Sequence, residues 1–265
     1  MKAFIYKVSL TLLSIVLISC AGGPQKTTNE SISSDSAQIQ SWPQINVDEF
    51  GEGSEIRIAG ERLMDSPMGL VQIQETGQNN DSILVIAVHG YQSSGYEWIT
   101  GLKHMTNHYG SLFFYRYDWT RCPEDVAEDL AASIQAIGSE SSYQRTIIFG
   151  HSYGGVVVTR LASKISALNV ELHVIAAPLA GYPELLDRCA QTGYAAWGKR
   201  VRVIQHKTVH AQDGAFRELD VDPQAIDLPF DEVHELPATM DGHRLGHNWS
   251  VTWVLDNYIG KYHRL

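Results

Sequence analysis

The chain has 265 residues, of which 44% are hydrophobic, and it carries a formal net charge of −10 at pH 7. This length is enough for one sizeable hydrophobic core and too short for two. The acidic balance argues against nucleic acids and anionic membrane surfaces as partners, because like charges repel.

Residues 1–19 have the pattern of an export signal. Lys2 and Lys7 lead into a mostly apolar run over residues 8–18, which is too short for a comfortable membrane span. The residues that end at Cys20 resemble the lipobox of bacterial lipoproteins. The resemblance implies cleavage before Cys20 and attachment of acyl chains there, which stably anchor a protein when two or more are present. Ala21 resembles the sorting pattern for the outer membrane, and we expect a cell-envelope protein that faces the periplasm.

Two other interpretations of this leader stay open: an ordinary secretory signal with an incidental cysteine, and an uncleaved membrane helix. Residues 20–44 are rich in Ser, Thr, Asn, Gln, Gly and Pro without a hydrophobic period, which is typical of a flexible tether. Residues 45–265 are then expected to form a single domain, and they contain no internal repeat.

Strand and helix patterns alternate along this domain. Short apolar or alternating runs predict strands at residues 55–59, 70–74, 83–88, 111–117, 146–149, 171–177 and 200–206. Helices are expected from residue 123 to about residue 137, over residues 155–165 and over residues 249–259. The first two strands suit an antiparallel edge. The alternation predicts an α/β fold, with a mostly parallel twisted sheet and helices on both faces.

The most informative motif is Gly150-His151-Ser152-Tyr153-Gly154, which has the pattern G-x-S-x-G. An apolar strand precedes it and a helical run follows it, which is the context that a nucleophile elbow requires. Small residues allow the backbone to turn sharply and lift the Ser152 hydroxyl above the carboxyl end of the sheet. The helix that follows points its positive N-terminus at the same place.

A second motif lies at the end of the strand at residues 83–88, which runs directly into His89-Gly90-Tyr91. With both motifs in place, residues 80–260 resemble the α/β-hydrolase superfamily, in its lipase and esterase part. The resemblance implies an oxyanion hole made by the backbone N–H groups of Tyr91 and Tyr153. The connection between the strands at residues 171–177 and 200–206 has no room for a large cap domain.

In this superfamily the chain order of the triad is serine, acid, histidine. The acid should follow the strand at residues 200–206, and the best match is Asp213, which precedes a glycine a short loop beyond that strand. The later acids Glu218, Asp220 and Asp222 remain alternatives. The base should lie just before the last helix, which favours His247, with His243 as the rival. His151, inside the elbow, is expected to point away from the site as a packed core residue.

The resemblance implies a serine hydrolase that cleaves a small-molecule or lipid carboxylic ester through an acyl-enzyme on Ser152, with no cofactor. An amidase, a thioesterase or an acyltransferase on the same scaffold stays open, as does a non-catalytic binding lipoprotein. Histidine pairs with i, i+4 spacing occur at 104/108, 206/210 and 243/247. None forms a His-Glu-x-x-His motif, so no metal site is expected.

Cys122 and Cys189 are the remaining cysteines. Each follows a predicted strand end, and both should lie on the face that carries the candidate site. Export would place them in an oxidising compartment. Geometry rather than sequence decides whether they form a disulfide, so the sequence leaves the bridge open.

Overall fold

The structure is a computed structural model that describes residues 42–50, 55–74, 82–109, 111–140, 143–165, 169–181, 189 and 193–262. The predicted leader, Cys20 and most of the predicted tether lie outside these residues. Among the described residues, no helix is long and apolar enough to cross a membrane.

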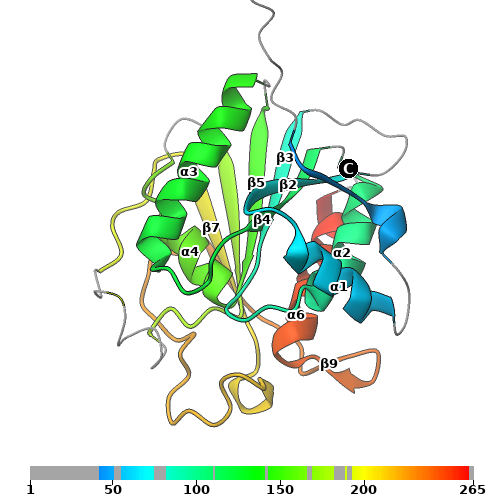
Figure 1. Cartoon of the computed structure of the whole chain (residues 1–265). Coiled ribbons are helices and arrows are strands. Elements are labelled where there is room, and N and C mark those ends of the chain that lie inside the picture. The colour runs from blue at the N-terminus through cyan, green and yellow to red at the C-terminus, as the bar shows by residue number, and fades with distance from the viewer. Residues whose placement is uncertain are drawn as a thin grey trace, which may run out of the picture. The chain divides into compact units, whose positions relative to one another are not determined.

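Among the described residues, a sheet of eight strands has the order β1-β2-β4-β3-β5-β6-β7-β8. Figure 1 shows its central strands between the helices that cover them. Its members are β1 (Gln44–Asn46), β2 (Gly69–Gln74), β3 (Ile83–Val88), β4 (Ser111–Arg116), β5 (Arg145–His151), β6 (Val170–Ile175), β7 (Val201–Lys207) and β8 (Glu232–Glu235). The pair β2–β4 is antiparallel and the other neighbouring pairs are parallel. The predicted mostly parallel sheet of the α/β-hydrolase fold is therefore confirmed.

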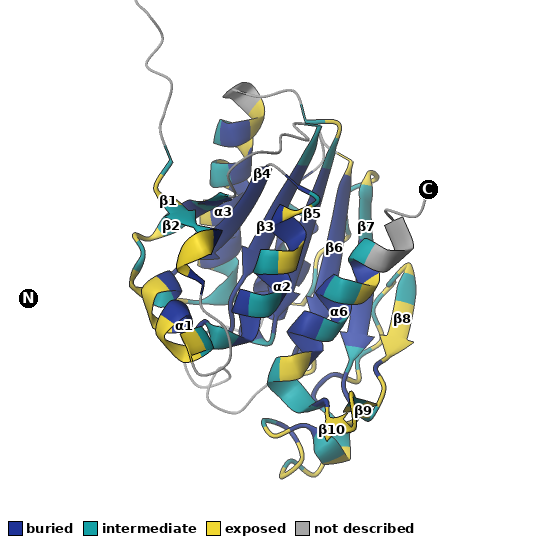
Figure 2. Cartoon of the chain, turned by 90° about the vertical axis from the view of Figure 1, so that its right-hand side faces the viewer, coloured by how far each residue is buried: buried dark blue, intermediate teal, exposed yellow. Residues whose placement is uncertain are grey.

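Helices cover both faces of this sheet. The helices α3 (Pro123–Glu140) and α4 (Tyr153–Leu161) pack on one face, and α1 (Ile56–Asp65), α2 (Tyr96–Thr106) and α6 (Gly246–Tyr262) lie on the other, as Figure 2 shows for α2 and α6. Each face has its own hydrophobic core, and β3 contributes alternate residues to the two. Such a strand is apolar throughout because both of its faces are buried.

The prediction of a strand at residues 55–59 is wrong, because this segment begins α1. Its local alternation of Ile56 and Ile58 looks like a strand, but Ile58 is exposed while Ala59 and Leu63 are buried. The buried residues therefore follow the i, i+3, i+4 period of a helix, which becomes visible only when the window extends to Leu63. The antiparallel strand near the edge is β2, and β1 lies outside it in parallel.

Several elements carry too little signal for prediction from sequence. The edge strand β8 is polar and mostly exposed, so it shows no apolar run. The short antiparallel pair of β9 (Thr239–Met240) and β10 (His243–Arg244) is also mostly polar. The sequence analysis also did not predict the helix α2. The connection from β6 to β7 covers residues 176–200, which is too short to form a cap with a core of its own.

Cys122 and Cys189 form a disulfide, with their Cα atoms 5.6 Å apart. Cys122 directly precedes Pro123, the first residue of α3. The bridge therefore fixes residue 189, within the β6–β7 connection, to the start of a helix that packs on the sheet.

Candidate active site

Ser152 stands in a sharp turn between β5 and α4. Its backbone has φ 55° and ψ −120°. Residues other than glycine rarely adopt this conformation, which costs about 1–3 kcal/mol. The turn is held by a hydrogen bond of 2.8 Å from the Ser152 N–H to the Ile175 carbonyl on the neighbouring strand. Strain of this kind persists only where the surroundings enforce it, and such outliers cluster at functional sites.

The glycines around Ser152 are required by close packing. A Cβ at Gly154 would lie 2.3 Å from the Val88 carbonyl oxygen, and one at Gly150 would lie 2.4 Å from the Gly154 carbonyl oxygen. A Cβ at Gly90 would come within 2.9 Å of the Ser152 Cβ. The loop after β3 therefore passes directly against the serine, as an oxyanion loop must.

His89 fixes the peptide that links Gly90 to Tyr91. Its Nδ1 lies 2.9 Å from the Gly90 carbonyl oxygen and its Nε2 accepts the Tyr117 N–H at 3.3 Å. A carbonyl can only accept, so Nδ1 carries the proton. Burial lowers the pKa of His89 to about 4, which keeps the ring neutral. Because C=O and N–H point in opposite directions in a trans peptide, holding the Gly90 carbonyl also sets the direction of the Tyr91 N–H.

Asp213 is fully buried and accepts several hydrogen bonds. Its Oδ2 accepts from the Thr208 hydroxyl at 2.5 Å and from the His247 ring at 2.9 Å, and its Oδ1 accepts from the Ala215 N–H at 2.8 Å. Burial alone would raise the pKa of Asp213, but the hydrogen bonds from His247 and the other donors outweigh it and hold the pKa below its ordinary value. The carboxylate is therefore charged and fixed in place.

His247 lies in the first turn of α6, with its Nδ1 on Asp213. A carboxylate can only accept a hydrogen bond, so Nδ1 carries the proton and donates to it. Nε2 is then the unprotonated, basic nitrogen of His247. The Phe216 ring packs nearly perpendicular to the imidazole, with centroids 4.9 Å apart. His247 and Ser152 line the same small pocket. A group bound in this pocket can therefore contact both side chains.

His151 is buried, as the sequence suggested, but the prediction that it points away from the site is wrong. Its ring packs against that of His247, with centroids 4.6 Å apart, and its Nε2 lies 3.1 Å from the His247 carbonyl oxygen. Burial, followed by the charge of His247, lowers the pKa of His151 far below its ordinary value, so the ring stays neutral. His151 thus supports the start of α6 from the sheet side.

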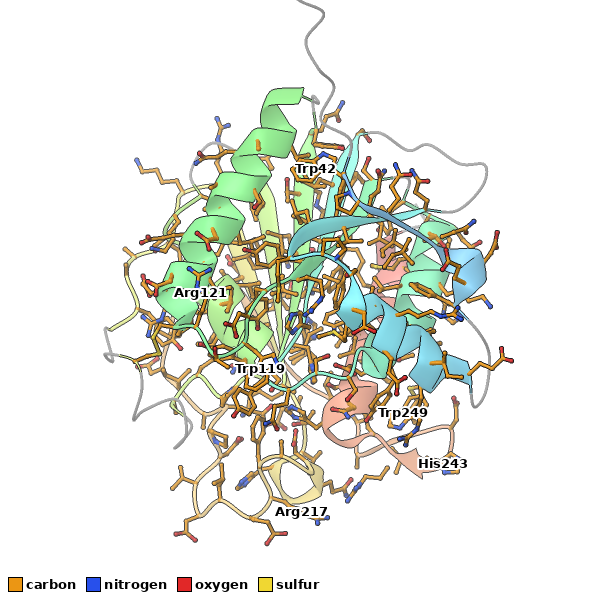
Figure 3. The ribbon with its side chains drawn as sticks, in the orientation of Figure 1. Trp42, Trp119, Arg121, Arg217, His243 and Trp249 are labelled. Atoms are coloured by element: carbon orange, nitrogen blue, oxygen red, sulfur yellow. A yellow bond between two sulfur atoms is a disulfide. The ribbon has the colours of Figure 1, made fainter. Side chains whose placement is uncertain are left out.

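The alternative site residues lie elsewhere. His243 is exposed on the β9–β10 hairpin (Figure 3), and Glu218 and Asp220 are exposed as well. Asp222 accepts the backbone N–H of Gln224 at 3.0 Å and does not reach His247. Within the described part of the chain, no group of three or more His, Cys, Asp or Glu side chains is arranged to hold a metal ion.

The pocket that joins these groups has a volume of about 70 Å³. Besides Ser152 and His247, its lining includes Tyr91 of the loop after β3, Glu97 of α2 and Asn248 of α6. The Asn248 amide donates to the Tyr96 hydroxyl. This space is polar and large enough only for a small chemical group.

Residues 85–256, well over half of the chain, match the alpha/beta hydrolase family. The chain belongs to the alpha/beta hydrolase family. No curated protein is similar enough in sequence to match. For this alpha/beta hydrolase, the fold and the serine elbow agree with the family assignment, while its substrate has to be argued from the site itself.

Three solved structures resemble this alpha/beta hydrolase at low sequence identity. A gene product of Listeria innocua has 11% identity and a TM-score of 0.49, covering 68% of this chain and 93% of that one. An alpha-beta serine hydrolase homologue from Coxiella burnetii has 13% identity and a TM-score of 0.47, covering 73% and 90%. An esterase of Pyrococcus furiosus has 11% identity and a TM-score of 0.47, covering 85% and 97%. Similarity at this level transfers no activity to the chain.

Sequence reasoning missed the residues that support this hydrolase site. Thr208 donates to Asp213, and Gln224 in turn accepts the Thr208 N–H at 2.9 Å. Glu97 and Asn248 line the pocket. His89 stands in the motif His89-Gly90-Tyr91 and Asn248 directly follows His247, so the positions of these two residues were usable signals.

Proposed function

We propose that this protein is a serine hydrolase that cleaves carboxylic esters through an acyl-enzyme on Ser152. The observation that carries the proposal is the joint arrangement of three residues. Ser152 stands in a strained elbow, and His247 shares its pocket. The Nδ1 of His247 lies 2.9 Å from the buried carboxylate of Asp213.

The proposed reaction follows from these positions. The Ser152 hydroxyl attacks the ester carbonyl while His247 Nε2 takes its proton, and Asp213 stabilises the imidazolium that forms. The backbone N–H groups of Tyr91 and Tyr153 stabilise the oxyanion, aided by the positive N-terminus of α4. His247 then protonates the leaving alcohol, and in the second half-reaction it activates the water that releases the acyl group.

A fluorophosphonate probe tests whether the serine is activated. We expect the wild-type protein to react at Ser152 and the Ser152→Ala variant to remain unlabelled. Ser163→Ala is a matched control, because the Ser163 hydroxyl donates only to the backbone of Arg160, outside the pocket. An unlabelled wild-type protein would favour the alternative of a non-catalytic binding lipoprotein. Labelling without ester turnover would instead favour an amidase, a thioesterase or an acyltransferase.

We also propose that the mature protein is anchored in the bacterial cell envelope through lipid on Cys20. The lipobox resemblance supports this proposal. It implies more than one acyl chain on Cys20, and two chains are enough to anchor a protein stably in a membrane. Cells grown with a labelled fatty acid should yield labelled wild-type protein and unlabelled Cys20→Ser protein. An unlabelled wild-type protein that is cleaved at another residue would contradict the anchor and leave the hydrolase proposal intact.

A further inference from the structure

Glu97 is a buried carboxyl in the pocket of the proposed nucleophile. It lies in the first turn of α2, is 7% exposed, and lines the same space as Ser152 and His247. A buried carboxylate is unfavourable unless positive charge or hydrogen bonds compensate it. Within the described residues, no lysine or arginine forms an ion pair with Glu97.

The compensation that Glu97 does receive is incomplete. The Ser93 hydroxyl donates to its Oε1, and its own backbone N–H makes a second hydrogen bond. An ionised carboxylate can accept about four hydrogen bonds, so acceptor capacity remains. Burial raises the pKa of Glu97, and the nearby His247 acts in the opposite direction. Among the described residues, Ser93 is the one side chain that donates a hydrogen bond to the Glu97 carboxylate.

A second polar side chain lines the same space. Asn248 lines the pocket and its amide nitrogen donates to the Tyr96 hydroxyl. An asparagine amide carries one carbonyl acceptor and two N–H donors, so Asn248 adds a further hydrogen-bonding group to this lining. The Ser93 hydroxyl is also in the lining, and it donates a hydrogen bond to the Glu97 carboxylate. The lining beside Ser152 and His247 is thus polar, and Glu97 is its buried acceptor.

We infer that this pocket binds a hydrogen-bond-donating group of the ester substrate, a hydroxyl or an ammonium, and that Glu97 is its acceptor. The inference rests on the proposed ester hydrolysis and names the class of substrate. A volume of about 70 Å³ holds a small group of this kind. A site with a buried polar group rejects an analogue that lacks the matching partner, because the polar group is then left unpaired.

Isosteric esters test the acyl side. The p-nitrophenyl esters of isobutyrate, lactate and alanine differ only in a methyl, a hydroxyl or an ammonium at one position. We expect kcat/KM for the lactate and alanine esters to exceed that for isobutyrate by about tenfold or more, after correction for alkaline reactivity. The alcohol side is tested by 2-hydroxyethyl acetate against propyl acetate. Preference in one pair alone identifies the side on which the donor lies.

Variants of Glu97 assign the preference to its carboxylate. Glu97→Gln keeps an acceptor without the charge, so it should lose the preference for alanine and retain most of that for lactate. Glu97→Leu should abolish both preferences. Glu235→Gln, an exposed glutamate on β8, is the matched control and should leave the ratios unchanged.

Fluorophosphonate labelling of Ser152 in the same samples separates the possible failures. A wild-type protein that does not label contradicts the proposed function itself. A protein that labels and hydrolyses isobutyrate and propyl esters as well as their donor-bearing partners overturns only the inference. If Glu97→Leu does not fold, the wild-type ratios and Glu97→Gln still decide the question.

Discussion

The two sides of the candidate site differ in how they are held. Ser152 and the oxyanion loop are fixed by backbone contacts, with carbonyl oxygens only 2.3–2.4 Å from where a Cβ would stand at Gly154 and Gly150. Asp213 and His247 are fixed by side-chain hydrogen bonds, from Thr208 to Asp213 within one loop and from His247 to Asp213 across 34 residues of the chain. The first side should therefore fail when a methyl group is added, and the second when a hydrogen bond is removed.

The largest effect is expected from the base. Replacing His247 with alanine should lower kcat by about 10³-fold or more, as for other members of a triad. His243→Ala is the matched control, because His243 is exposed on the β9–β10 hairpin. Steady-state ester hydrolysis measures both. An inactive His243→Ala with an active His247→Ala would move the base and leave the fold assignment intact.

A methyl group at Gly90 tests the backbone side. Its Cβ would lie 2.9 Å from the Ser152 Cβ and 3.4 Å from the Ser152 Oγ, so Gly90→Ala should displace the oxyanion loop and lower kcat by about 10²-fold. Gly214→Ala, beside Asp213, adds the same methyl where nothing lies within 4 Å. It should retain activity within about twofold. Equal losses in both variants would contradict the distinction between the two sides.

Removal of one hydrogen bond tests the other side. Thr208→Val keeps the shape of the side chain but removes the donor 2.5 Å from the Asp213 Oδ2. A hydrogen bond to a charged group contributes about 1.5–3 kcal/mol, and we expect kcat to fall about tenfold as His247 becomes less well oriented. Thr239→Val, on the exposed strand β9, is the control. Unchanged kcat and unfolding free energy in Thr208→Val would show that Asp213 does not depend on this donor.

A smaller difference between the two sides is expected in how the unfolding free energy depends on pH. The pKa of Asp213 lies below its ordinary value of 3.8, so its contribution to stability is present above that pH and is lost as pH falls through the folded-state pKa. The difference in unfolding free energy between wild type and Asp213→Asn should therefore shrink below pH 3.8. Ser152→Ala should differ from wild type by a constant amount. A pH-independent difference for Asp213→Asn would contradict the charged carboxylate.

The sequence predicted most of the residues around Ser152 and the loop after β3. It predicted few of the residues that hold Asp213 and His247 in place. A nucleophile elbow needs small residues at fixed positions around Ser152, and the strand–turn–helix pattern is local, so one window contains the whole signal. The apolar strand before His89 is equally local. Both motifs could therefore be read directly from the chain.

The acid–base side was assigned only through chain order in a resembling family. Thr208 and Gln224 act through hydrogen bonds to residues several positions away, which no periodicity encodes. No motif singles out Glu97, which reaches the pocket because α2 carries it there. Contacts between distant segments depend on the folded topology, so a single sequence carries no pattern for them.

Trapping the acyl-enzyme tests the central proposal most directly. Protein quenched during turnover of p-nitrophenyl acetate, then digested and analysed by mass spectrometry, should carry one acetyl group on Ser152. The adduct should be absent from Ser152→Ala, which should also lose turnover. Acetylation of a different residue, or hydrolysis that persists at the wild-type rate in Ser152→Ala, would contradict a serine acyl-enzyme mechanism.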